Sequence, residues 1–146
     1  DVIANKPDYL SLLCGVNDTW YYMDKPYDFD RQAYYKAFTN LICEIKAELP
    51  DVKIMILEPF FSEGFCTNNT DEDKDRLERY REKCPQIAAA ANRIAQKYNL
   101  KFVPLQEKFD KLCKTAPADC WLTDGVHPAP AGHKLIAEEL IKALDL

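Results

Sequence analysis

Two short stretches of the chain are almost continuously apolar. Residues 8–14 (DYLSLLC) follow Pro7, and residues 53–59 (KIMILEP) lie between polar segments. Apolar runs of this length, bounded by turn-forming residues, are typical of strands that are covered on both faces of a sheet. A third, shorter run, KFVPL at residues 101–105, has the same character. The pattern therefore predicts three strands.

Between the first two strands, apolar residues recur at three- and four-residue spacing. This spacing predicts an amphipathic helix over residues 29–49, which buries one face and exposes the other. Asp28 or Asp30 is placed to cap its start, and Pro50 lies just beyond its end.

The same spacing returns after the second strand and predicts a long helix over residues 77–98. Pro85 is expected to kink or restart this helix because proline lacks the N–H that the helix needs. Asn99 fits its C-terminal cap. Two further helices are predicted, a short one over residues 107–114 and a closing one over residues 130–144.

Strands that alternate with helices predict right-handed βαβ units and a parallel sheet, so the expected fold is a single layered α/β domain over residues 1–146. In such sheets, ligands bind beyond the carboxyl ends of the strands. The loops expected to matter are residues 15–27, residues 59–72 and the segment before the last helix.

Composition and charge restrict the classes of partner. The chain has 146 residues, of which 47% are hydrophobic and 29% are charged, as in one soluble globular domain. The net charge of -5 arises from interspersed acids and bases. Because nucleic acid is held by clustered lysine and arginine, it is not an expected partner. A membrane span is not expected either, since no window approaches the roughly 18 consecutive apolar residues that one requires.

The six cysteines are scattered without a CxxC pair, which argues against a zinc knot or a thioredoxin-like redox site. Most are expected to be buried free thiols, which favours an intracellular location. A disulfide between Cys113 and Cys120, which flank one loop, stays open as an alternative. The two histidines are unsuited to a metal site, so no metal or other cofactor is expected.

The clearest chemical cluster is WLTDGVHPAPAGH at residues 121–133, which contains both histidines. Asp124 precedes His127 across a tight Asp-Gly turn. A carboxylate at this spacing can accept a hydrogen bond from one imidazole nitrogen and leave the other nitrogen free as a general base. This is the acid-base half of a hydrolytic triad, although Asp and Gly are also ordinary turn residues.

A second polar cluster, GVND at residues 15–18, follows the first predicted strand. Taken alone it predicts only a turn, because Gly, Asn and Asp are common after strands. Since both clusters fall in strand-end loops, Asn17 is expected to face His127 across the strand ends.

These clusters resemble two motifs of the SGNH hydrolases, also called GDSL-type esterases and lipases. PDYLSLLCGVND is similar to the family's third block and DGVHPAPAGHKLIAEEL to its fifth, with EPF between them. The resemblance implies a flavodoxin-like, three-layer α/β/α fold with a parallel sheet. It also implies that Asn17 is a side-chain oxyanion donor, His127 the general base and Asp124 its orienting partner. His133 matches no catalytic block and is interpreted as a helix-start or packing residue.

The family's first two blocks carry the nucleophilic serine and an oxyanion-hole glycine, and they precede the third block, near which this chain begins. The chain is therefore expected to be the C-terminal portion of the domain, to lack the first two βα units and to be inactive alone. The missing first strand would lie beside residues 8–14. Without it, the strand at residues 8–14 is expected to pair with another copy of the chain or with a separate N-terminal piece.

Ser11 is predicted inside the first strand. Neither Ser62 nor Cys66 lies on the strained strand-to-helix turn that exposes such a nucleophile, so both are weak substitutes for the missing serine. Four aromatic residues near the predicted site are instead candidates for substrate binding, although aromatic clusters are more often plain packing. They are Trp20, Phe60, Phe61 and Trp121.

The resemblance implies a serine carboxylic-ester hydrolase acting on a small ester. The aromatic-rich loop after GVND and the WLTDGVHP segment resemble bacterial members that remove acetyl or short acyl groups from carbohydrates. A lysophospholipase or thioesterase of the same family is the first alternative. A non-catalytic α/β binding domain that has lost its nucleophile is the second.

Overall fold

The computed structural model describes residues 2–23 and 31–144. Its centre is a parallel three-stranded sheet in the order β1-β2-β3, which confirms the three predicted strands. Leu10 pairs with Ile54 between the first two strands, and Met55 pairs with Lys101 between the last two. The strands are β1 (Tyr9–Leu13), β2 (Lys53–Leu57) and β3 (Lys101–Val103).

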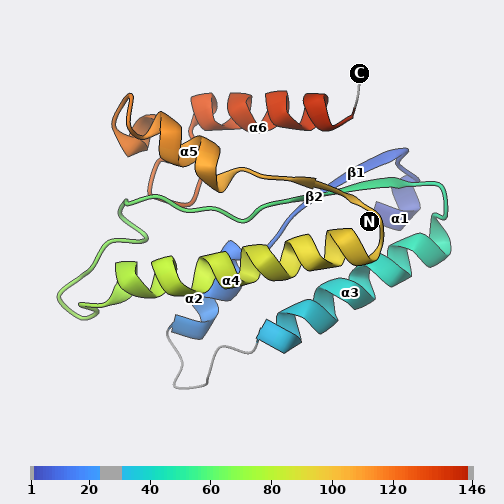
Figure 1. Cartoon of the computed structure of the whole chain (residues 1–146), viewed down its shortest axis with the longest axis horizontal. Coiled ribbons are helices and arrows are strands. Elements are labelled where there is room, and N and C mark those ends of the chain that lie inside the picture. The colour runs from blue at the N-terminus through green and yellow to red at the C-terminus, as the bar shows by residue number, and fades with distance from the viewer. Residues whose placement is uncertain (1, 24–30, 145–146) are drawn as a thin grey trace.

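Helices cover both faces of this sheet, so the fold is α/β, as predicted (Figure 1). The helices α3 and α4 lie on one face, and α5 and α6 lie on the other. The helical elements are α1 (Val2–Asn5), α2 (Val16–Met23), α3 (Arg31–Glu48), α4 (Arg76–Lys97), α5 (Gln106–Leu112), the 3-10 turn η1 (Ala118–Cys120) and α6 (Pro130–Ala143).

The hydrophobic core has two halves because successive side chains of β2 point to opposite faces of the sheet. Ile54 and Ile56 pack with α3 and α4, whereas Met55 and Leu57 pack with α5 and α6. All four are buried, as the apolar run predicts for a central strand. The fully buried members from other elements include Ile42, Ile87, Ile94 and Phe109.

The long helix α4 runs through Pro85 as one element, so the alternative that the helix restarts there is wrong. Its end matches the prediction. Asn99 adopts φ +50°, its N–H donates to the carbonyl of Gln96 at 3.3 Å, and the N–H of Leu100 donates to Ala95 at 2.8 Å. This pair of bonds is a Schellman motif, which asparagine can close because it tolerates the left-handed region.

Several expectations are wrong. Residues 16–23 form α2 and not a loop, and Gly15 starts this helix by accepting both the N–H (3.0 Å) and the hydroxyl (3.1 Å) of Thr19. The six cysteines are free thiols, but only Cys84 is buried. The proposed caps Asp28 and Asp30 lie outside the described residues.

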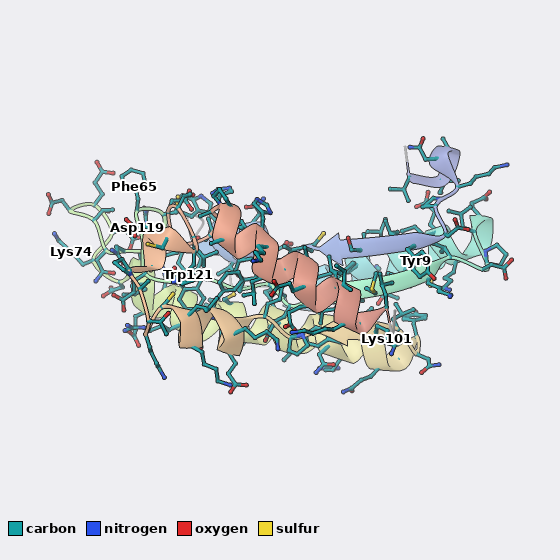
Figure 2. The ribbon with its side chains drawn as sticks, turned by 90° about the horizontal axis from the view of Figure 1, so that it is seen from above. Tyr9, Phe65, Lys74, Lys101, Asp119 and Trp121 are labelled. Carbon is teal, nitrogen blue, oxygen red and sulfur yellow. The ribbon has the colours of Figure 1, made fainter. Side chains whose placement is uncertain are left out.

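Strand β1 is covered on one face only, contrary to the prediction. Leu10 and Leu12 pack toward α3 and α4, but Tyr9 and Leu13 on the other face are 42% and 43% exposed. The reason is that α6 lies over β3 and β2 and leaves β1 beside it uncovered (Figure 2). Within the described residues, β1 also pairs on one side only.

None of the described helices is long and apolar enough to span a bilayer.

Candidate active site

The segment that carries Asp124 and His127 joins η1 to α6. Figure 2 places Trp121, at the start of this segment, at the end of the molecule opposite Tyr9 and Lys101, which begin β1 and β3. The segment therefore lies at the carboxyl ends of the strands, where parallel sheets bind ligands.

Backbone hydrogen bonds close this segment on itself. The N–H of Thr123 donates to the carbonyl of His127 at 2.8 Å, and the N–H of Ala129 donates to the carbonyl of Trp121 at 2.8 Å. The hydroxyl of Thr123 donates to the same His127 carbonyl at 3.1 Å. His127 is consequently held in a rigid loop, which suits a residue that must keep a fixed orientation.

The carboxylate of Asp124 organises the turn inside this loop. One oxygen, Oδ1, accepts the N–H groups of Val126 (3.1 Å) and His127 (2.9 Å). The other, Oδ2, lies 2.7 Å from Nδ1 of the His127 ring. Gly125 adopts φ +100°, a conformation that favours glycine, and this allows the chain to turn back.

This geometry assigns different roles to the two ring nitrogens of His127. In the neutral ring, Nδ1 is the donor to the carboxylate, so Nε2 is left unprotonated and able to accept a proton. The His127 side chain is 73% exposed, so the ring is accessible to solvent. The pair therefore has the arrangement of a general base with its orienting acid.

The pKa of Asp124 reflects two opposing effects. Partial burial would raise it, but hydrogen bonds from the His127 backbone and ring, from the Val126 N–H and from the Cys66 thiol together hold it well below the usual value. Asp124 is therefore ionised at neutral pH and can stabilise a positive charge on His127.

The loop that follows β2 contacts the Asp124–Gly125 turn through backbone hydrogen bonds, and this contact was not predicted from the sequence. The N–H of Ser62 donates to Gly125 at 2.8 Å, and the N–H of Cys66 donates to the carbonyl of Asp124 at 2.8 Å. Gly64 packs on the turn so closely that a Cβ there would lie 2.4 Å from the Asp124 carbonyl carbon. We call residues 62–67 the clasp loop.

The segment between β2 and the clasp loop is hydrogen-bonded to the start of α5. The carboxylate of Glu58 accepts the N–H groups of Leu105 (2.6 Å) and Gln106 (2.9 Å). The Gln106 side chain in turn bonds both the N–H (3.0 Å) and the carbonyl (2.8 Å) of Phe61. Glu58 and Gln106 therefore set where the chain leaves β2 for the clasp loop.

Asn17 and His127 line the same cavity, of about 200 Å³. Gly15 permits this placement, because its φ of +133° lets the chain turn from β1 directly into α2, where Asn17 is the second residue. The cavity is formed by Leu13, Cys14, Gly15, Val16, Asn17, Pro59, Phe60, Val126, His127 and Pro128.

Of the four aromatic candidates for substrate binding, only Phe60 lines the cavity, and the other three lie elsewhere. Phe60 is buried and lines the cavity. Phe61 is stacked on Tyr80 with ring centroids 5.5 Å apart, and Trp20 lies 6.4 Å from the same ring. Trp121 packs against the half of the hydrophobic core that lies between the sheet and the helices α5 and α6. Among the described residues, the lining of the cavity includes neither tryptophan, and Phe61 lies on a neighbouring cleft.

The substitute nucleophiles are poorly placed. The Ser62 hydroxyl bonds the Glu63 carbonyl (3.4 Å), and the Cys66 thiol faces Asp124 (3.4 Å). Ser11 lies within β1. Cys14 lines the cavity and was missed from the sequence, but partial burial and the Asp18 carboxylate raise its pKa, which disfavours the thiolate.

The remaining histidine lies away from this arrangement. His133 is exposed in the first turn of α6, where its N–H donates to the carbonyl of Ala129 at 2.9 Å. Across residues 2–23 and 31–144, no three His, Cys, Asp or Glu side chains form a group that could hold a metal ion.

Comparison with known proteins supports a single relationship. The model of the GDSL-like lipase/acylhydrolase family matches residues 1–135. An acetylxylan esterase of Geobacillus stearothermophilus is 33% identical over 149 residues, covering 99% of this chain and 62% of that protein. The chain thus spans less than two thirds of the length of this relative.

Solved structures agree. A crystal structure of a protein from Parabacteroides merdae, described as a GDSL-like lipase, has a TM-score of 0.82 at 32% identity. The match covers 98% of this chain and 62% of the Parabacteroides chain. The structure of the Geobacillus acetylxylan esterase has a TM-score of 0.75 at 29% identity. The match covers 100% of this chain and 63% of the esterase chain. Catalytic mutants of that enzyme alter a serine, an aspartate and a histidine, the last two three positions apart.

Proposed function

This chain belongs to the GDSL-like lipase/acylhydrolase family, and from that premise we propose that it forms part of a carboxylic-ester hydrolase. The observation that carries the proposal is the 2.7 Å hydrogen bond between His127 Nδ1 and Asp124 Oδ2, with Asn17 and His127 on one cavity. The catalytic aspartate and histidine of the Geobacillus enzyme have the same spacing as Asp124 and His127.

In the proposed reaction, a serine hydroxyl attacks the ester carbonyl while Nε2 of His127 takes its proton. Asp124 stabilises the imidazolium, and the Asn17 amide donates to the oxyanion of the tetrahedral intermediate. His127 then gives the proton to the leaving alcohol. Water, activated by His127 in the same way, hydrolyses the acyl enzyme.

We propose that the attacking serine comes from a segment outside these 146 residues. No serine is among the described residues that line the cavity. A serine is one of the catalytic residues of the Geobacillus enzyme, and this chain covers only 63% of the chain in that enzyme's solved structure. The enzyme would thus assemble its site from this chain and a further part of the same protein.

The proposed substrate is the acetyl or short-acyl ester of a carbohydrate. A cavity of about 200 Å³ is smaller than the roughly 300–1,000 Å³ of typical drug-sized ligand pockets, which suits a small acyl group. Its wall includes the apolar residues Leu13, Val16, Pro59 and Phe60. An acetylxylan esterase among the relatives supports the same substrate class.

The test is hydrolysis of chromogenic esters by the full-length protein that contains this chain. Acetyl ester should be hydrolysed faster than octanoyl ester, and His127→Ala should reduce kcat by at least about 10³-fold. His133→Ala is the matched control and should retain activity, because His133 lies away from the cavity. Equal activity in both variants would refute the assignment of His127. Turnover by the 146 residues alone that depends on His127 would refute the external serine.

A further inference from the structure

Cys66 contacts Asp124 through two separate groups. Its backbone N–H donates to the Asp124 carbonyl at 2.8 Å, and its thiol donates to Oδ2 of the Asp124 carboxylate at 3.4 Å. That oxygen is the one that bonds the His127 ring. The thiol therefore bonds the carboxylate that orients the proposed general base.

The thiol completes the hydrogen bonding of the carboxylate. A carboxylate has about four acceptor positions, two on each oxygen. Val126 and His127 N–H groups occupy Oδ1, and His127 Nδ1 occupies one position of Oδ2. The Cys66 thiol takes the fourth. All four donors restrict rotation of the carboxylate, and only the thiol comes from outside the turn itself.

Cys66 is suited to donate because its thiol stays protonated. Partial burial of the thiol, its hydrogen bond to Asp124 and the charge of that carboxylate raise the pKa of Cys66, and only the guanidinium of Arg76 acts in the opposite direction. A protonated thiol is a weak donor, but its acceptor here is charged, which strengthens the bond.

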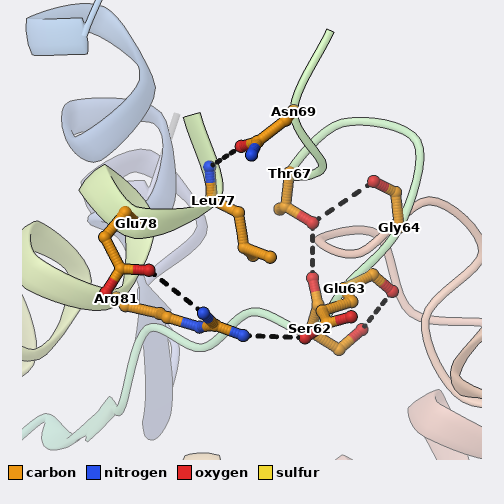
Figure 3. Close-up of polar contacts among 8 residues, drawn as sticks. All are labelled: Ser62, Glu63, Gly64, Thr67, Asn69, Leu77, Glu78 and Arg81. Atoms are coloured by element: carbon orange, nitrogen blue, oxygen red, sulfur yellow. Dashed lines mark hydrogen bonds and ion pairs between the residues drawn. The ribbon is translucent and has the colours of Figure 1, made fainter. Parts of the chain in front are cut away.

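Hydrogen bonds within the clasp loop and to α4 hold the loop that carries Cys66 (Figure 3). The Thr67 hydroxyl donates to the Ser62 carbonyl at 2.5 Å and closes the loop. Arg81 on α4 donates to Glu63 at 2.8 Å, which ties the loop to α4. Just beyond the loop, the Asn69 side chain accepts the N–H of Leu77 at 3.0 Å.

We propose that Cys66 is a positioning residue, which fixes the Asp124 carboxylate and thereby the orientation of the His127 ring. This role rests on the proposed function of the Asp124–His127 pair. It differs from a nucleophilic role, for which the thiol would have to face Nε2 of His127 as a thiolate.

Activity of the full-length protein tests the role through matched variants. Cys66→Ala should lower kcat for an acetyl ester about fivefold with KM unchanged, since it removes one hydrogen bond to a charged group. Cys66→Ser should restore kcat to within about twofold, because a hydroxyl can donate in the same place. Cys120→Ala, an exposed cysteine before the same turn, should behave like the wild type. Equal losses in the Ala and Ser variants, or no loss in either, would overturn the proposal.

An infrared measurement separates this proposal from the esterase proposal. The S–H stretch of Cys66 is isolated as the difference between the protein and Cys66→Ser. It should lie at lower frequency than for an unbonded thiol and should rise in Asp124→Ala, with Asp124→Asn as a second variant should the first not fold. A band that does not move in either variant overturns the contact, whether or not the protein hydrolyses esters.

Discussion

Gly64 lies directly against the backbone of Asp124, across a contact that leaves no room for a side chain. A Cβ at Gly64 would lie 2.4 Å from the Asp124 carbonyl carbon and 2.4 Å from the Gly125 nitrogen. Both neighbours are backbone atoms, so neither can move aside without shifting the turn that holds His127. The clasp loop and the proposed catalytic turn are therefore coupled through their main chains.

Gly64→Ala should reduce both stability and activity. Forcing a methyl group into a closed contact typically costs about 1–3 kcal/mol, and relief requires that the clasp loop and the Asp124 turn separate. Urea unfolding should show this loss, and kcat should fall with it. Asn68, which is exposed and directly follows the clasp loop, provides the control, since Asn68→Ala should change the free energy of unfolding by less than about 0.5 kcal/mol. An unchanged Gly64→Ala protein would show that the contact is looser than the structure indicates.

Asp124 should give stability a measurable acid dependence. Its folded pKa lies below the usual value of 3.8, so its contribution to stability is present above that pH and is lost as pH falls through the folded pKa. The free energy of unfolding of the wild type should exceed that of Asp124→Asn at neutral pH. The difference should shrink below about pH 4.

Denaturant unfolding from neutral pH to pH 3 measures that difference. Asp119→Asn, which alters an exposed aspartate in η1, is the control and should follow the wild type throughout. A wild-type advantage that stays constant as the pH falls would contradict ionised Asp124 as the source of the stability.

The local structure could largely be predicted from the sequence, because periodicity and capping are local properties. The helix end at Asn99 and the central strand Lys53–Leu57 follow from residues that are close together in the chain. The Asp124–His127 hydrogen bond belongs to the same class, since the two residues are three positions apart in a turn.

The errors arise where distant segments decide the outcome. The clasp loop meets Asp124 across 58 positions of sequence, and no pattern in SEGFCT indicates that contact. The exposure of Leu13 was not predicted because an apolar strand looks the same whether a helix covers it or not. Residues 16–23 were expected to be a loop because their polar start hides a helix that Gly15 and Thr19 initiate.

Asn17→Ala should lower activity without lowering stability. Removing one oxyanion donor typically reduces kcat by about 10²–10³-fold. Truncating an exposed side chain, in contrast, changes the free energy of unfolding by less than about 0.5 kcal/mol. Asn17 is exposed, as is Asn40 on α3, so Asn40→Ala is a matched control. The measurement is kcat and KM for an acetyl ester with the full-length protein. A change confined to KM would indicate that Asn17 binds the ground state and does not stabilise the oxyanion.

The uncovered strand β1 should make the isolated 146-residue chain self-associate. Within the described residues, its outer edge has no partner strand and its Tyr9 and Leu13 side chains are exposed, a combination that favours pairing with a second strand. Ser11 lies in the middle of this strand and is exposed, so Ser11→Lys places a charge on the edge without disturbing the core. Sedimentation equilibrium should show a concentration-dependent oligomer that Ser11→Lys weakens about tenfold. Ser62→Lys changes the same residue type on the clasp loop and should leave association unchanged. A chain that stays monomeric at the highest concentration reached would contradict pairing through β1.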